Sequence, residues 1–153
     1  MKTMSNTNQP LPDEREDDVS HINVYMAGKS RLGRLLSNLA DIQVTHPKYG
    51  KFRTLEGLWF YLKSGMVHED LRAMSGYDAK KFGGGVKKVW FPDFMAEIKI
   101  GIRCKIEQHA ELKELVEEST LPFEHYYVYP SGVVVPRGSK LLCQMLEDIR
   151  SEM

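Results

Sequence analysis

One apolar repeat limits the fold of this chain more than any other feature of its sequence. Between Pro92 and Gln108, apolar residues recur at intervals of three or four, at Met95, Ile98, Ile102 and Ile106. This spacing places all four side chains on one face of a long α-helix. That face must be covered, so the chain needs further elements that pack against it.

A second helix is predicted from residue 55 to residue 64. Thr54 is its expected N-cap, because a threonine hydroxyl can accept a hydrogen bond from a free N–H group of the first helical turn. Four apolar residues fall on one face by helical spacing, namely Leu55, Leu58, Trp59 and Leu62. Three other residues share a different face, namely Glu56, Phe60 and Lys63.

The rest of the chain is predicted to form short elements. We expect four further helices, at residues 67–76, 78–85 and 109–119 and after Ser139. Gly76 is the expected end of the first, and Asp78 and Ser139 are the expected caps of the second and the last. A strand is expected at 21–25, a connection at 30–40, and hairpins around 46–49 and 130–132. The order of the elements is strands, then helices, a hairpin and a last helix. This order favours a mainly α fold with small antiparallel β pieces (α+β) over an alternating α/β fold.

Length and composition are typical of one globular domain. The chain has 153 residues, with 21 basic and 21 acidic side chains. Residues 1–20 are polar and acidic, so we expect a disordered tail before a folded domain at 21–153. Zero net charge gives no overall basic field for long nucleic acid. No apolar run could span a membrane, and no signal peptide is evident. Cys104 and Cys143 form no paired motif. A cytoplasmic protein without a membrane partner is therefore expected.

Motifs for metals and cofactors are not evident in the sequence. The five histidines show no HxxxH spacing and there is no CxxC, so neither a metal nor a cofactor is expected. The run FGGGVKK at 82–88 could present N–H groups to a phosphate. It has neither the P-loop spacing nor the dinucleotide spacing, which favours a flexible loop.

Two charged residues, Glu56 and Lys105, are candidates for chemistry. An acid in the first turn of a helix gains roughly 0.3–1 kcal/mol from the helix dipole. Glu56 is therefore either a helix-start acid or the reactive group of a pocket, and its own sequence context leaves both open. Lys105 lies among the apolar positions of the long helix, so its stem could follow the core edge with the amine directed into a cleft.

Several stretches, taken in order, resemble the NADAR, or YbiA-like, family. They are INVY, LLSNLADIQV, TLEGLWFYLKSG, AKKFGGGVKKVWFPDFMAEIKIGIRCKIEQHAEL and RGSKLLCQMLEDIR. The resemblance covers about residues 22 to 150. The Lys-x-x-Gln-x-x-x-Leu pattern from Lys105 to Leu112 is its most specific part. The resemblance implies a single YbiA-like domain.

The resemblance also implies a function. Members of this family are N-glycosidases, hydrolases that cleave a bond between a ribose carbon and a nitrogen. The implied substrates are ribosylated bases or nucleotides, such as ADP-ribosyl-guanine or riboflavin-pathway pyrimidine ribose phosphates, and ADP-ribosylated nucleic acid is an implied partner. The family's catalytic positions fall on Glu56 and Lys105, and its substrate-binding positions on Ser37, Asn38 and Trp90. We add Phe60 and Lys63, which share the Glu56 face, and Tyr129.

Departures from the family pattern affect part of this site. The histidine that usually follows the glutamate is Gly57, and the closing helix has Lys140 where the family has Asn. Near the C-terminus, the family's Asp-x-x-Trp-Gly is replaced, with Tyr129 at the Asp position and Gly132 near the Trp position. Activity could therefore be lost, or shifted to another substrate with Glu124 or a tyrosine substituting. The alternative function is a catalytically impaired ADP-ribose- or nucleotide-binding module, or an interaction scaffold that uses the acidic tail.

Overall fold

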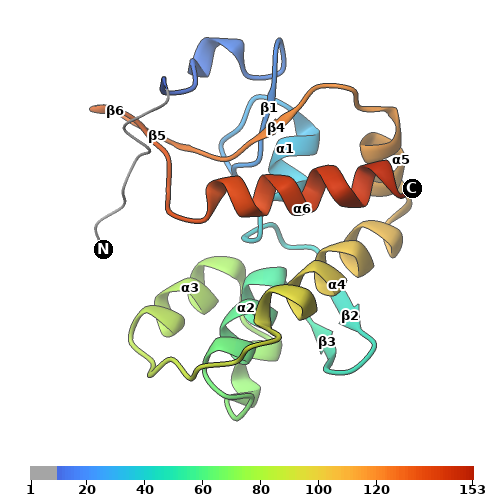
Figure 1. The fold of residues 1–153 in the computed structure, drawn as a ribbon. Coiled ribbons are helices and arrows are strands. Elements are labelled where there is room, and N and C mark those ends of the chain that lie inside the picture. Colours follow the sequence, from blue (N-terminus) through green and yellow to red (C-terminus); the bar gives the residue numbers. More distant parts are fainter. Residues whose placement is uncertain (1–9) are drawn as a thin grey trace. The chain divides into compact units, whose positions relative to one another are not determined.

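The computed structural model of the chain describes residues 10–153 (Figure 1). This part contains six α-helices and three two-stranded β-sheets, two of them antiparallel. The predicted α+β class is therefore confirmed. The fold divides into two compact units. Unit 1 comprises the described residues up to Ser37 together with Glu114–Met153, and unit 2 is Asn38–Lys113. None of the helices in the described part is long and apolar enough to cross a membrane.

Unit 2 combines one hairpin with three helices and a short 3-10 helix. In chain order these are β2 (Val44–His46), β3 (Gly50–Phe52), α2 (Leu55–Lys63), the 3-10 helix η2 (Glu69–Arg72), α3 (Gly76–Gly84) and α4 (Phe94–Glu107). β2 and β3 pair antiparallel with Val44 opposite Phe52, which confirms the first predicted hairpin. Helix α5 (Ala110–Glu118) follows and crosses the division into unit 1.

Unit 1 combines an N-terminal and a C-terminal stretch of the described residues. Its elements are the 3-10 helix η1 (Glu14–Glu16), β1 (Ile22–Asn23), α1 (Arg31–Leu36), β4 (Phe123–Glu124), β5 (Tyr127–Tyr129), β6 (Gly132–Val134) and α6 (Ser139–Ser151). β5 and β6 form the second predicted hairpin. β1 and β4 lie side by side as a parallel pair (Figure 1), with Ile22 opposite Phe123. The local sequence pattern did not predict this pairing.

The two helices with the clearest apolar repeats form close to where the sequence predicts them. α2 begins after Thr54, whose hydroxyl accepts a hydrogen bond from the Gly57 N–H at 3.1 Å. α4 begins at Phe94, two residues after the predicted start at Pro92. Three of its four predicted core residues, Ile98, Ile102 and Ile106, are buried.

Several predicted helix boundaries are wrong. Gly76 begins α3 instead of ending a helix, and Ser75, not Asp78, caps it by accepting from the Asp78 N–H. Residues 69–72 form only a 3-10 helix. Ser139 is the first residue of α6 rather than its cap, and its hydroxyl donates to the His125 carbonyl. The predicted connection at 30–40 contains α1, with Ser30 as N-cap.

The segment predicted to be a disordered tail divides into two parts. Residues 1–9 lie outside the described residues. In the described part, Glu14–Glu16 forms η1 and Asp17 is buried. The Asp17 carboxylate accepts hydrogen bonds from the Asn23 N–H at 2.9 Å and the Lys29 N–H at 2.8 Å. Ordered structure therefore begins before residue 21, because a buried carboxylate fixes this turn to the strand that follows.

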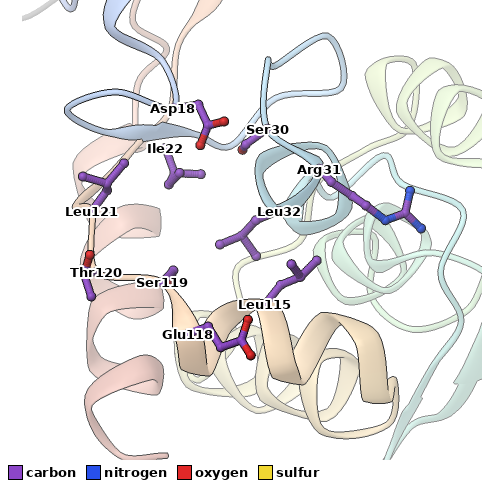
Figure 2. Close-up of a pocket in the computed structure, with 10 residues that line it drawn as sticks. All are labelled: Asp18, Ile22, Ser30, Arg31, Leu32, Leu115, Glu118, Ser119, Thr120 and Leu121. Atoms are coloured by element: carbon purple, nitrogen blue, oxygen red, sulfur yellow. The ribbon is translucent and has the colours of Figure 1, made fainter.

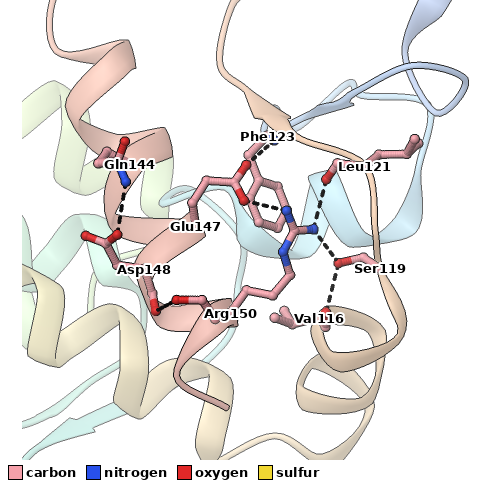
Figure 3. Close-up of polar contacts among 9 residues, drawn as sticks. Val116, Ser119, Leu121, Phe123, Gln144, Glu147, Asp148 and Arg150 are labelled. Atoms are coloured by element: carbon pink, nitrogen blue, oxygen red, sulfur yellow. Dashed lines mark hydrogen bonds and ion pairs between the residues drawn. The ribbon is translucent and has the colours of Figure 1, made fainter.

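Arg150 on α6 holds the segment between α5 and β4 in unit 1 (Figure 3). Its guanidinium donates to the Leu121 carbonyl at 2.8 Å and to the Ser119 hydroxyl at 2.9 Å, and it pairs with Glu147. Glu147 in turn accepts from the Phe123 N–H at 2.9 Å. The guanidinium also lies 4.2 Å from the centre of the Phe123 ring.

Replacing Arg150 with Met should therefore destabilise the protein. The change leaves the Leu121 carbonyl and the Glu147 carboxylate without their cationic donor, and we expect the free energy of unfolding to fall by about 2–4 kcal/mol. Urea denaturation measures this loss. Lys140→Met, on the exposed side of the same helix, is the control and should change stability by less than about 0.5 kcal/mol. Equal stability of the two variants would contradict the role given to Arg150.

A buried histidine closes the β2–β3 turn in unit 2. His46 Nδ1 accepts from the Lys48 N–H at 3.0 Å and the Tyr49 N–H at 3.3 Å, so the proton of the neutral ring is on Nε2. Nε2 is buried without a hydrogen-bond partner among the described residues, and the nearest Glu97 oxygen is 3.5 Å away. Burial lowers the pKa of His46, against the opposing effect of Glu97.

Acid should weaken the fold through His46. Because the pKa is lower in the folded protein, the unfolded chain binds this proton more readily as the pH falls below about 6.5. The contribution of His46 to the free energy of unfolding should therefore decrease as the pH falls from about 6.5, so the His46→Asn variant should lose less stability on acidification than the natural protein. Denaturation at a series of pH values tests it, with the partly exposed His68→Asn as control. A slope that survives in His46→Asn would assign the effect to another group.

Candidate active site

The backbone fixes Glu56 at the start of α2, within unit 2. The Glu56 N–H donates to the Asn38 carbonyl at 3.0 Å. Thr54 adopts an extended conformation and caps the same turn. The first turn of α2 is thus held from two sides, and the Glu56 and Asn38 backbones lie next to each other.

Helix α4 packs antiparallel on α2. A Cβ atom on Gly101 would lie only 2.6 Å from Leu58 and 3.3 Å from Leu55, so α4 touches the N-terminal half of α2 at this glycine. Seven residues earlier, the Phe94 ring packs on Trp59 farther along α2, with 4.8 Å between ring centres. Moving toward the C-terminus of α4 therefore means moving toward the N-terminus of α2.

This geometry places Lys105 beside the N-terminal half of α2. Lys105 follows Gly101 by four residues, so it lies on the same side of α4 and roughly 6 Å farther along the helix axis. That displacement carries it past Leu55 to the N-terminal end of α2. Glu56 and the predicted binding residue Asn38 are thus neighbours through their backbones, whereas Lys105 lies on the side of α2 that Leu55 and Leu58 turn toward α4.

Glu56 has the properties of a reactive acid. Its side chain is only partly exposed, and burial raises its pKa to about 7. The positive charge of Lys80 opposes this rise. Near neutral pH, Glu56 is therefore present in both protonated and ionised forms. Such a group can donate or accept a proton without a large free-energy cost.

Lys105 is buried much more deeply. Its side chain is 1% exposed, and burial lowers its pKa to about 7. A large fraction of the amine is therefore uncharged near neutral pH. An uncharged amine is a nucleophile, whereas an ordinary surface lysine is almost fully protonated.

Asn38 contributes a free hydrogen-bond acceptor to this region. Its side-chain oxygen is buried and has no hydrogen-bond partner within residues 10–153. Burying such an oxygen without a donor costs roughly 1–3 kcal/mol. A bound ligand with an N–H or O–H group would supply the missing donor.

Phe60 and Lys63 lie on the same face of α2 as Glu56, and all three are partly exposed. Phe60 packs against α3, where a Cβ on Gly83 would overlap its ring. The Lys63 amine lies 5.0 Å from the centre of the Phe94 ring and 5.6 Å from the centre of the Trp59 ring. The structure therefore forms the predicted face, with aromatic rings and a cation along it.

Trp90 lies in the segment between α3 and α4 and is 86% exposed. The adjacent Val89 N–H donates to the Lys63 carbonyl at 2.7 Å, which anchors this segment to the C-terminal end of α2. No contact in the described residues joins the Trp90 ring to Glu56 or Lys105. Its indole is open to solvent and to a ligand.

The remaining predicted binding residues belong to unit 1. Ser37 is buried at the C-terminal end of α1. Tyr129 is 48% exposed in β5, with its ring centre 6.1 Å from that of Tyr127. Of the eight predicted site residues, Asn38, Glu56, Phe60, Lys63, Trp90 and Lys105 are in unit 2.

The structure leaves no space for a side chain at position 57. A Cβ on Gly57 would lie 2.6 Å from the Leu71 carbonyl oxygen of η2. Backbone therefore occupies the space that a side chain would need. A histidine role in catalysis cannot be filled at this position.

A cavity of about 400 Å³ lies in unit 1 between the start of α1 and the end of α5 (Figure 2). Ile22, Leu32 and Leu115 give it an apolar wall, and the Asp18 and Glu118 carboxylates lie at its edge. None of the predicted site residues lines it. Within the described residues, no group of three or more His, Cys, Asp or Glu side chains is arranged to hold a metal ion.

Lys80 is the site residue that the sequence analysis missed. Its positive charge opposes the rise in the pKa of Glu56, and it belongs to a helix whose start was predicted two residues too late. The signal that could have found it is the repeat Gly76, Lys80, Gly83, which has the i, i+4, i+7 spacing of one helix face.

Comparison with known proteins identifies the fold. No protein-family model matches this chain, and no curated protein matches it either. Among solved structures, the NMR structure of the E. coli protein YbiA is similar, with a TM-score of 0.65 and 20% sequence identity over 92% of each chain. The chain therefore has a YbiA-like fold over nearly its whole length.

Proposed function

We propose that this protein is an N-glycosidase that hydrolyses the bond between ribose and a nitrogen base in a ribosylated base or nucleotide. The observation that carries the proposal is the half-buried Glu56 at the N-terminal end of α2, next to Asn38, whose side-chain oxygen is buried without a hydrogen-bond partner among the described residues. The YbiA-like fold and the sequence resemblance to the NADAR family support the same activity.

Glu56 suits both halves of the reaction. When the C1′–N bond breaks, its electron pair leaves with the base, which needs a proton, and positive charge develops on the sugar. Protonated Glu56 can supply the proton, and ionised Glu56 can stabilise the charge or activate the water that adds to C1′. A pKa of about 7 makes both forms available at neutral pH.

Lys105 has two possible roles in this chemistry. It can pair with the ribose phosphate as a cation. Alternatively, it can attack C1′ of the opened sugar as an amine while the bond from C1′ to the base nitrogen breaks and the base leaves with a proton; water then hydrolyses the lysine imine and frees the amine. Complete burial and the resulting pKa of about 7 favour the second role, since a phosphate partner would have to be a charged ammonium.

Binding would use the partly exposed face of α2. The Asn38 side-chain oxygen can accept from a ribose hydroxyl or a base amine. Phe60 and the exposed Trp90 offer ring surfaces for a base, and Lys63 offers a cation for a phosphate. Ser37 and Tyr129 stay predicted binding residues. In this proposal an ADP-ribosylated nucleic acid is a substrate only through its modified base.

A binding module without turnover is the second candidate. Gly57 leaves no space for the family's histidine, and Tyr129 replaces its aspartate. If these groups are required for the bond-breaking step, the pocket would hold ADP-ribose or a related nucleotide unchanged.

One assay separates these functions. The protein is incubated with ADP-ribosylated guanosine, NAD and pyrimidine ribose phosphates, and the free base is followed by chromatography. Release of base supports the N-glycosidase, whereas binding by calorimetry without product supports the binding module. If the protein neither binds nor cleaves any of these compounds, both candidate functions are overturned and the scaffold remains.

A further inference from the structure

Helix α3 lies parallel to α2 and in close contact with it. At its start, a Cβ on Gly76 would overlap the Leu39 backbone. At its end, a Cβ on Gly83 would overlap the Phe60 ring of α2. Backbone thus approaches backbone at one end, and backbone approaches a ring at the other, so α3 has little freedom to shift.

Lys80 lies between these two contacts. It follows Gly76 by four residues and precedes Gly83 by three, so it is on the same side of α3 as both glycines. Glu56 occupies the matching place on the opposite side. The Glu56 N–H donates a hydrogen bond to the carbonyl of Asn38, the residue before Leu39. Glu56 also precedes Phe60 by one helical turn. The packing of the two helices therefore places Lys80, which is exposed, on the side of α3 that faces the Glu56 face of α2.

Two charged lysines flank this face of α2. Lys80 is an exposed residue of α3, and Lys63 lies two turns along α2 itself. The third lysine, Lys105 of α4, is buried, and burial lowers its pKa to about 7. The segment of Asn38 and Leu39 contributes no charge. Of the three lysines, Lys80 is the one whose charge acts on the pKa of Glu56, in the direction that lowers it, while burial raises it.

We infer that Lys80 is a positioning residue for this site, which keeps part of the Glu56 population ionised near neutral pH. It acts through Glu56 and need not touch the substrate. The consequence for catalysis rests on the proposed function. The effect on the protonation of Glu56 does not, because it is a property of the free protein.

The side-chain carboxyl of Glu56 can be titrated by carbon-detected NMR in the free protein. Replacing Lys80 with Met should move the titration midpoint of Glu56 upward, by an amount on the order of 0.5 pH unit. Lys80→Arg retains the charge and should keep the midpoint of the natural protein. Lys81→Met is the matched control, because Lys81 is the next lysine along α3, is exposed and is turned about 100° away.

An unchanged midpoint in Lys80→Met, or equal shifts in Lys80→Met and Lys81→Met, would overturn the inference. A fingerprint spectrum of each variant verifies that it is folded. If the protein releases base, the acidic limb of its pH–rate profile should move upward with the same variant. A shifted midpoint in a protein without turnover would support the role of Lys80 while contradicting the proposed function.

Discussion

Glu56→Gln should reduce base release by roughly 10²–10⁴-fold while leaving the protein folded. Glutamine has nearly the same shape, but it can neither give up nor take a proton. The raised pKa of Glu56 also means that its contribution to stability is complete below about pH 4.5 and is lost as the pH rises to about 7. Above pH 7 the variant should therefore be at least as stable as the natural protein.

Chromatography of the released base and urea denaturation at pH 7.5 together measure this prediction. Glu114→Gln is the matched control, because Glu114 is an exposed acid on α5. Activity should survive in the control. Full activity in Glu56→Gln would rule out an acid–base or charge-stabilising role for this residue, and a loss of stability would make its activity uninformative.

Lys105→Met should change activity and stability in opposite directions. Base release should fall by about two orders of magnitude or more, because the variant has no amine. The folded protein disfavours the charged form of Lys105, whose pKa falls from 10.5 to about 7. The stability of the natural protein should therefore rise between about pH 7 and pH 10.5, where the unfolded chain binds the additional proton.

Methionine fills a similar volume without a charge to bury, so Lys105→Met should raise the free energy of unfolding at pH 7 by about 1–3 kcal/mol. Its stability should also rise less between pH 7 and 9. Denaturation curves at the two pH values measure both effects. Lys51→Met, an exposed lysine of β3, should show neither. Destabilisation at pH 7 by Lys105→Met would indicate that the amine is charged and well paired in the folded state.

Local sequence signals predicted the elements that carry the site. Thr54 marked the start of α2 because its hydroxyl can replace a missing backbone partner, and the structure shows that bond. The isoleucine repeat marked α4 because three or four residues separate positions on one helix face. These signals depend only on neighbours in the chain, so no knowledge of the fold was needed.

Elements that depend on distant contacts were missed. α1 contains Gly33, which reads as a connection, yet a Cβ there would clash with the Asn23 carbonyl, so close packing on β1 requires the glycine. Gly76 was likewise interpreted as a helix stop because it is a glycine. In the structure it begins α3, and its missing side chain allows close contact with the Leu39 backbone. β1 pairs with β4, about 100 residues later in the chain, and no local pattern indicates that pairing.

The candidate site shows the same division. Glu56 and Lys105 were suggested by the family resemblance, and their own surroundings in the sequence left a structural role open. The antiparallel contact of α4 with α2 at Gly101 sets the position of Lys105, and the parallel contact of α3 at Gly83 sets that of Lys80. At both glycines a neighbouring helix packs where a side chain would otherwise be. A single sequence does not reveal which helix that is.

The central claim is that Glu56 is an acid shielded from water at the N-terminal end of α2, on the face that packs against α3. The most direct measurement is the titration of its carboxyl carbon in the unmodified protein. A midpoint near pH 7 is predicted. A midpoint near the ordinary value of 4.5 would show that Glu56 is solvated like a surface acid, and would contradict the account.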